Sequence, residues 1–429
     1  MEFEVLKRGH IKRNIIIGSF AVLLISAIIL NFTRAKYRTT AEVPIASGTI
    51  NYSLADLNIV AITVDGESVE TIPEGNYELT DESYCIVDGE DTQLTLNWDN
   101  ETKALSVTPF TTKGTKCYLY FEEATTKTVD TPLGEVEVNL DQPDFSKTSC
   151  TSGCGEQTVG LYEETTSKGT TYYYRGDVNN NYVSFAGYYW RILRISEDGS
   201  IRMIYDGTSP HTNGQSSTNR QIQTSVYNSS YNRSYYVGYT YLSNAQRPSN
   251  PNSGTSSTIK GVLDNWYNTN LQQYDNIITN TPGFCNDREM ANGSNWSSLP
   301  TNDIYYAAYD RILNNSTASL ECSNSNDLYQ TKIGLITADE VIHAGLNQSG
   351  SNAKFYLFTG TNYWTITPSY VQAVNTSVSW PNMFYVYSYG SLSYDRLENE
   401  YGVRPVINIS SNATITGEGT MSNPYTIVS

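Results

Sequence analysis

Few residues in this chain are of types that could do chemistry: two histidines beyond the N-terminal region, scattered carboxylates and six cysteines. A serine hydrolase needs a histidine beside a positioned serine, and the sequence has no Gly-x-Ser-x-Gly motif. We expect His343 to act as a cation at the end of a short helix, and His211 to lie in a solvated loop. Neither histidine is predicted to be a general base.

Paired carboxylates could hydrolyse a glycosidic bond, one acting as acid and the other as base or nucleophile. Asp339 and Glu340 are neighbours on a predicted helix, so they do not face each other, and Glu340 forms a capping box with Thr337. For Asp395 and Glu398 we favour contact with a polar ligand. No catalytic residue is assigned, and a carboxylate-dependent hydrolase acting on cell-wall or glycan substrates is the alternative function.

The cysteines form three pairs by proximity: Cys85 with Cys117, Cys150 with Cys154, and Cys285 with Cys322. An even number of cysteines in an exported chain predicts disulfides, although the sequence does not fix the connectivity. Zinc is the alternative, but the Cys150–Cys154 pair lacks a second ligand pair at a suitable spacing. The cysteines are therefore interpreted as disulfides, with no metal assigned.

Asparagine-rich segments could bind calcium. Residues 179–181 and 324–327 are candidates, although neither matches a twelve-residue calcium loop. We predict no cofactor and keep calcium as the alternative.

Tyrosine and serine dominate the last quarter of the chain, and only six of the 35 tyrosines precede Cys150. Tyrosine offers a large amphipathic ring at a low entropic cost, and with serine it is typical of recognition loops. The spacing of Tyr385, Tyr387 and Tyr389 predicts one face of a strand, which either packs on the sheet or meets a ligand. The predicted ligand-binding residues are Tyr370, Trp380, Tyr385, Tyr387, Tyr389, Tyr394, Asp395, Arg396 and Asn399.

The N-terminus predicts a membrane anchor. A basic cluster within residues 1–14 precedes an apolar run from Ile15 to Leu30. The run is slightly shorter than the roughly 20 residues of a comfortable span, and the cluster places its own end in the cytoplasm. We predict a cytoplasmic segment 1–14, an uncleaved transmembrane signal anchor 15–33 and a single-pass cell-membrane protein with an extracellular C-terminal part. A cleaved signal peptide is the alternative, but no small-x-small site follows Leu30.

The net charge of −17 is distributed without a basic stripe. Such a charge argues against nucleic acid and anionic lipid surfaces as partners, and it favours solubility.

Three parts are expected beyond the anchor. Short β-branched runs with turn residues predict an all-β sandwich spacer over residues 40–123. The order Cys85, Trp98, Cys117 is similar to that of an immunoglobulin domain, but the spacing is too short, so "Ig-like" describes the architecture alone. Residues 124–149 are interpreted as a threonine-rich linker, in which 136–140 could still form a strand. Residues 150–429 form the head domain.

The head is predicted to be α+β with long loops. Asp198-Gly199 predicts a hairpin between strands at 188–195 and 201–205. Helices are expected after Ser256 and Ser257, over 303–313, and from Thr337 to Gly345. The polar tract 207–256 is too long for an ordinary connection, which is typical of functional or disordered segments.

An ordered set of motifs in the head resembles a large group of uncharacterised bacterial surface domains. The set comprises residues 183–185, 190–193, 262–268, 334–341, 363–368 and 402–407. That group is similar to the C-type-lectin-like and formylglycine-generating-enzyme (sulfatase-modifying-factor) fold. The enzyme of that fold needs paired cysteines near its C-terminal Gly-x-Arg strand, whereas Cys322 is the last cysteine here. The resemblance therefore implies the fold without the activity.

A looser resemblance is to variable receptor proteins diversified by retroelements, which display Tyr, Ser, Asn and Asp near the end of the same fold. The segment 380–399 has this composition. The predicted function is therefore that of an extracellular bacterial surface protein that binds a glycan or protein ligand without catalysis. A structural envelope protein that self-associates through the tyrosine-rich face is a further alternative.

Overall fold

A computed structural model of the chain describes residues 58–70, 75–87, 90–91, 95–99, 104–108, 116–152 and 156–428. These residues form mainly β-strands with few helices, so the fold is richer in strand than the predicted α+β class. The chain divides into two compact units, Met1–Ala124 and Thr125–Ser429. The predicted cytoplasmic segment 1–14 and anchor 15–33 lie outside the described residues. Within the described ranges, no helix combines the length and apolarity that a membrane span requires.

The regular elements in the described part of the first unit are all β-strands, as the strand pattern of residues 40–123 predicts. Its main sheet has the order β2-β1-β8-β4-β5, with β3 also paired to β8, and a separate hairpin joins β6 to β7. Trp98 on the hairpin packs on Phe121 of the sheet, with ring centroids 5.1 Å apart. The bounds are β1 (Asn58–Val64), β2 (Glu67–Val69), β3 (Tyr77–Leu79), β4 (Tyr84–Val87), β5 (Glu90–Asp91), β6 (Thr95–Asp99), β7 (Ala104–Thr108) and β8 (Lys116–Glu123).

The disulfide of this unit differs from that of an immunoglobulin domain. Cys85 and Cys117 are bonded as predicted, and they are directly paired residues on the adjacent antiparallel strands β4 and β8. An immunoglobulin bridge instead joins two facing sheets. The bridge is therefore not of the immunoglobulin type, as the short spacing indicates, and the described part of the unit is shown only to be rich in β-strands.

The interpretation of residues 124–149 as a linker is wrong. Strands β9 (Thr126–Thr131) and β10 (Gly134–Asn139) form an antiparallel hairpin that belongs to the second unit. Val138 is fully buried in the core of that unit, and Lys127 forms an ion pair of 2.8 Å with Glu163. The alternating valines supply an apolar face that the threonine-rich composition conceals.

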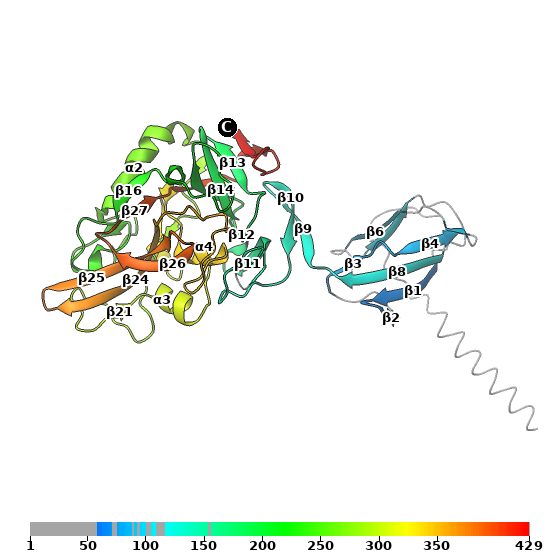
Figure 1. The fold of residues 1–429 in the computed structure, drawn as a ribbon, viewed down its shortest axis with the longest axis horizontal. Coiled ribbons are helices and arrows are strands. Elements are labelled where there is room, and N and C mark those ends of the chain that lie inside the picture. Colours follow the sequence, from blue (N-terminus) through cyan, green and yellow to red (C-terminus); the bar gives the residue numbers. More distant parts are fainter. Residues whose placement is uncertain are drawn as a thin grey trace, which may run out of the picture. The chain divides into compact units, whose positions relative to one another are not determined.

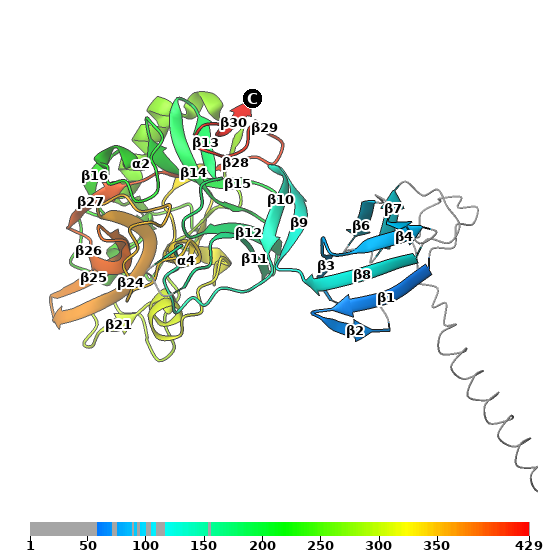
Figure 2. The same ribbon diagram turned by 45° about the vertical axis from the view of Figure 1, so that its right-hand side comes forward.

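The second unit contains two large sheets (Figures 1 and 2). The first has the order β19-β28-β15-β14-β13-β30-β29, with β12 beside β14, β11 beside β12, and β23 beside β28. The predicted hairpin around Asp198-Gly199 is confirmed as β14 and β15. The bounds are β11 (Gly160–Thr166), β12 (Gly169–Arg175), β13 (Tyr182–Phe185), β14 (Tyr188–Ile195), β15 (Ile201–Gly207), β19 (Ile278–Thr279), β23 (Ile333–Gly334), β28 (Val406–Ile409), β29 (Thr414–Thr416) and β30 (Tyr425–Val428).

The second sheet has the order β16-β27-β24-β25-β26, with β21 paired to β24. Its strands are β16 (Gln223–Val226), β21 (Ile304–Tyr305), β24 (Tyr363–Asn375), β25 (Val378–Tyr387), β26 (Ser391–Arg396) and β27 (Glu400–Val403). The register of β24 against β25 shifts at three places. Such bulges bend strands, which explains the strong curl of β24 and β25 in Figure 2.

Helices and short strands complete the unit. Helix α2 (Thr258–Asn270) begins at the N-cap Ser257, and α4 (Ala338–His343) has the predicted capping box of Thr337 and Glu340. The helix expected over 303–313 begins later, at Ala307. It consists of the short α3 (Ala307–Tyr309) followed by one π-helical turn (Asp310–Asn314). The short pairs are β17 (Thr240–Tyr241) with β18 (Thr255–Ser256), and β20 (Phe284–Cys285) with β22 (Leu328–Tyr329).

The polar tract 207–256 is an ordered part of this unit. Tyr227, Val237 and Tyr239 of the tract are buried in the common core. Arg220 of the tract donates to Asp206 Oδ1 at 2.7 Å, and Arg404 Nη2 donates to the same oxygen at 3.0 Å. Arg404 is buried and also donates to the backbone oxygens of Tyr205 and Leu357, so it has a structural role.

Candidate functional site

The nine predicted ligand-binding residues lie in or beside the β24–β25–β26 sheet but not on one face of it. Successive side chains of a strand point to opposite faces. Phe384 is paired with Tyr394 across β25 and β26, whereas Tyr385 is paired with Ser393. Ring contacts separate accordingly into two groups, one around Tyr394 and one around Tyr385. A single ligand therefore cannot contact all nine residues.

The first group, the inner aromatic group, consists of Trp364, Tyr385, Tyr387, Tyr389 and Tyr401. Ring centroids are 4.5 Å apart for Tyr385 and Tyr401, and 5.1 Å apart for Tyr387 and Tyr389. Exposure rises from 7% at Tyr385 to 36% at Tyr387 and 67% at Tyr389. Tyr385 is thus part of the packed core, while Tyr389 is on the surface at the end of the row.

The second group, the outer aromatic group, consists of Tyr305, Tyr309, Tyr370, Tyr394 and Trp380. Tyr305 stacks on Tyr370, with centroids 5.8 Å apart and planes at 19°, and Tyr370 meets Tyr394 edge-on at 5.2 Å. Tyr309 contacts Tyr394 at 5.9 Å. All five side chains are partly exposed. They therefore present several aromatic faces and edges to solvent at one place.

Trp380 joins this group through Arg396. The Arg396 guanidinium lies 4.6 Å from the centroid of the Trp380 ring, and its Nε lies 3.3 Å from Glu398 Oε1. Arg396 and Tyr394 are two residues apart on β26, so both point to the outer face. The outer group thus combines aromatic rings with a half-exposed cation that can donate hydrogen bonds.

Sequence reasoning missed Tyr305 and Tyr309. Tyr305 is directly opposite Tyr370 in the ladder between β21 and β24, and Tyr309 follows on α3. The spacing of four residues between them is a visible helix-type signal. The sequence does not show, however, that this distant segment meets β24.

Asp395, one of the predicted polar contacts, is already hydrogen-bonded within the protein. Asp395 accepts hydrogen bonds from the hydroxyl of Tyr401 at 2.5 Å and from the backbone N–H of Arg396 at 2.8 Å. The backbone N–H of Asn399 donates to Arg396 O at 3.2 Å, which closes the turn before β27. Asp395 therefore positions Tyr401 on the inner face, away from the outer group.

Burial and neighbouring rings change the titration of the outer tyrosines. Burial, with Tyr394 as the strongest neighbour, raises the pKa of Tyr309 to about 12. The same two causes raise the pKa of Tyr370. Both phenols are therefore neutral at physiological pH and act as hydrogen-bond donors and acceptors.

The expectation for His211 is wrong. Its side chain is buried, its Nδ1 lies 2.8 Å from Asp206 O, and burial lowers its pKa. The polar tract 207–256, which carries His211, packs at the end of β15 instead of extending into solvent. His343 does lie in the last turn of α4, but it is buried as well, and its Nε2 contacts Glu164 Oε2 at 2.5 Å.

The carboxylate pair Asp339 and Glu340 is engaged in buried ion pairs. Asp339 holds Arg311 through two hydrogen bonds of 2.7 Å, and Glu340 lies 2.5 Å from Arg202. Opposed carboxylates of a glycosidase would leave one group free to protonate the substrate. The pair therefore shows no arrangement for hydrolysis.

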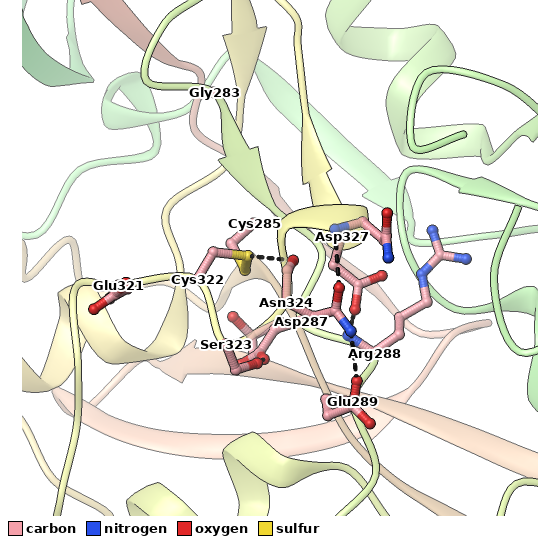
Figure 3. Close-up of a disulfide and its surroundings, with 12 residues drawn as sticks. Gly283, Cys285, Asp287, Arg288, Glu289, Glu321, Cys322, Ser323, Asn324 and Asp327 are labelled. Atoms are coloured by element: carbon pink, nitrogen blue, oxygen red, sulfur yellow. Dashed lines mark hydrogen bonds between the residues drawn. A yellow bond between two sulfur atoms is a disulfide. The ribbon is translucent and has the colours of Figure 1, made fainter. Parts of the chain in front are cut away.

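Side chains from both calcium candidates make contacts within the protein. Asn181 is fully buried and bonds to Arg191 and to the backbone of Ile192. Around the second candidate, Asn324 donates to Glu289, and Asp327 accepts from the backbone of Arg288 beside the Cys285–Cys322 disulfide (Figure 3). Across the described ranges, no group of three or more acidic, histidine or cysteine side chains could hold a metal ion.

The predicted disulfides are present where the structure describes them. Cys285 is bonded to Cys322, as Cys85 is to Cys117. Cys150 is also disulfide-bonded, and its predicted partner Cys154 lies outside the described residues.

No family model, curated protein or solved structure matches this chain. The lectin-like fold implied by the resemblance therefore stays a prediction.

Proposed function

We propose that this is a recognition protein whose second unit binds an extracellular glycan without catalysis, through the outer aromatic group. The observation that carries the proposal is the contiguous set of partly exposed rings Tyr305, Tyr309, Tyr370 and Tyr394 beside the Trp380–Arg396 pair. The apolar faces of sugar rings pack on aromatic rings, and their hydroxyls bond to nearby polar groups.

The proposal includes the lectin-like fold of this unit and an attachment to the cell membrane through residues 15–33, with the described units outside the cell. The disulfides support an extracellular location of these units, because disulfides persist in oxidising compartments. The long curled strands β24 and β25, which carry Tyr370 and Trp380 of the outer group, support a recognition unit built on a sheet.

A glycan is favoured over a protein ligand because of the size of the group. Five neighbouring aromatic side chains provide a small patch, whereas a stable protein interface buries about 800 Å² on each partner. A protein ligand would instead be shown if this protein still bound a surface protein from which the glycans had been removed.

A glycan array tests the proposal. The purified protein is applied with calcium and with a chelator, next to the variant Trp380→Ala with Tyr394→Ala. We expect a specific hit that the double variant loses while its circular dichroism spectrum is unchanged. Unaltered binding by a folded double variant would place the site elsewhere, and turnover of a bound glycan would overturn the non-catalytic part.

A further inference from the structure

A cleft in the second unit, lined by none of the outer aromatic residues, has charged side chains as half of its lining residues. Its cavity volume is about 50 Å³, and the Cys285–Cys322 disulfide forms part of its wall. Arg194 and Arg202 come from β14 and β15, Glu340 comes from α4, and the exposed Lys168 lies at its edge. This volume is several times the roughly 15 Å³ that one water needs, so a small polar group can enter.

On one side of the cleft the charged side chains form ion pairs with one another. Arg311 donates to both oxygens of Asp339 at 2.7 Å and to Asp287 Oδ2 at 2.5 Å. Burial alone lowers the pKa of Arg311, but the two carboxylates outweigh it and raise the value above normal. These three side chains satisfy one another, so they form a wall and offer little to a ligand.

The other side brings two arginines together. Arg194 and Arg202 are directly paired across β14 and β15, a position at which like charges repel. Both approach a single oxygen, Glu340 Oε1, at 3.4 Å for Arg194 Nε and 2.5 Å for Arg202 Nε. The other Glu340 oxygen accepts from Thr337 N at 2.9 Å. One shared carboxylate oxygen thus serves two guanidinium groups.

Arg202 makes further hydrogen bonds, whereas Arg194 has only ion-pair contacts with Glu340 and Glu197 among the described residues. Arg202 Nη1 lies 3.2 Å from both Gly283 O and Asn408 Oδ1. For Arg194, Nε and Nη1 are buried without a hydrogen-bond partner among the described residues, and the nearest other acid, Glu197, lies 3.9 Å away. Its side chain is only 9% exposed. A buried guanidinium with unmet donors costs free energy unless a ligand supplies acceptors.

We infer that this cleft binds a carboxylate group, held by Arg194 with Arg202 behind it. A planar carboxylate offers two acceptor oxygens that match the fork of a guanidinium. A monoanion is favoured over a dianion such as phosphate, because Glu340 and Glu197 lie beside the same arginines. The volume admits the carboxylate and not a whole sugar, so the rest of a larger ligand extends toward Lys168.

The carboxylate could belong to a free organic acid or to an acidic sugar. Thermal unfolding of the purified protein is measured with sodium acetate, with sodium glucuronate and with glucose, at equal ionic strength adjusted with sodium chloride. Stabilisation by both anions assigns the site to the carboxylate alone. Stabilisation by glucuronate alone assigns it to an acidic sugar. A response to glucose equal to that to glucuronate, or no response to either anion, would overturn the inference.

Variants locate the site. We expect Arg194→Ala to keep its unfolding midpoint within a few degrees of wild type and to weaken carboxylate binding at least tenfold. Arg194→Lys keeps the charge but loses the planar fork, so it should also bind more weakly. Lys168→Ala, at the edge, is the matched control and should lose at most about threefold. Wild-type affinity in both Arg194 variants would contradict the assignment.

The double variant Trp380→Ala with Tyr394→Ala separates this site from the proposed glycan surface. It should lose the array hit and retain the response to carboxylates. If the folded double variant lost both glycan binding and the response to carboxylates, the cleft would belong to the glycan site. That result would contradict the inference of a separate carboxylate site.

Discussion

The two faces of the β24–β25–β26 sheet carry aromatic groups of similar composition and opposite environment. On the inner face, Trp364 is fully buried, and its indole N–H donates to Ser225 O at 2.9 Å. On the outer face, Tyr370 and Tyr394 remain partly exposed and touch each other edge-on. The same residue types therefore build, on the inner face, a row that runs from the buried Trp364 to the exposed Tyr389, and on the outer face a candidate binding surface that is partly exposed throughout. Tyrosine content alone does not tell them apart.

The largest expected effect is on the inner face. Trp364→Ala removes a fully buried indole and its hydrogen bond, so it should lower the free energy of unfolding by about 4 kcal/mol. Tyr370→Ala on the outer face removes a partly exposed ring and should cost about 1 kcal/mol. Denaturant unfolding of both variants measures the difference. Equal losses would contradict the distinction between the two faces.

A smaller effect is expected at the contact between Tyr401 and Asp395. Tyr401→Phe keeps the ring and removes the hydroxyl that donates to Asp395 at 2.5 Å, so it should cost about 1 to 2 kcal/mol. Tyr387→Phe, an exposed tyrosine on the same face of β25, is the matched control and should change the free energy of unfolding by about 0.5 kcal/mol or less. Tyr401→Phe should leave ligand binding unchanged, and a loss of affinity in that variant would move the site toward the inner face.

Alkaline titration sharpens the comparison further. The pKa of Tyr309 is raised to about 12, against about 10 for an unfolded tyrosine. A raised pKa means that the folded state holds the proton more tightly. The associated stability is therefore complete below pH 10 and is lost as the pH rises toward 12. Absorbance titration at 295 nm should show tyrosines that ionise late, and Tyr309→Phe should remove one of them. Titration of all tyrosines near pH 10 in the folded protein would contradict the packing.

The smallest effect is expected at the surface end of the inner row. Tyr387→Ala with Tyr389→Ala removes two exposed rings, so it should change the free energy of unfolding by about 0.5 kcal/mol or less. Thermal unfolding checks this value. A large loss would show that these rings pack more tightly than their exposure indicates.

Local features of the fold could be predicted from the sequence. The capping box of Thr337 and Glu340 and the hairpin at Asp198-Gly199 are both present, because neighbouring residues determine each one.

The candidate site could be predicted only in part, because it depends on contacts between distant segments. Tyr305 meets Tyr370 through a strand pairing that the sequence does not reveal. Alternation along β25 and β26 divides the predicted residues between two faces, which the tyrosine-rich composition conceals. His211 is buried by a tract whose polar composition indicates a solvated loop.

The central claim is that recognition belongs to the outer aromatic group, and the affinities of two double variants for one array hit test it most directly. Trp380→Ala with Tyr394→Ala should weaken binding by about 30-fold or more, which corresponds to about 2 kcal/mol at the centre of a binding surface. Tyr387→Ala with Tyr389→Ala, on the opposite face, should stay within about twofold of wild type. The reverse order of affinities, or equal losses in the two folded variants, would contradict the account.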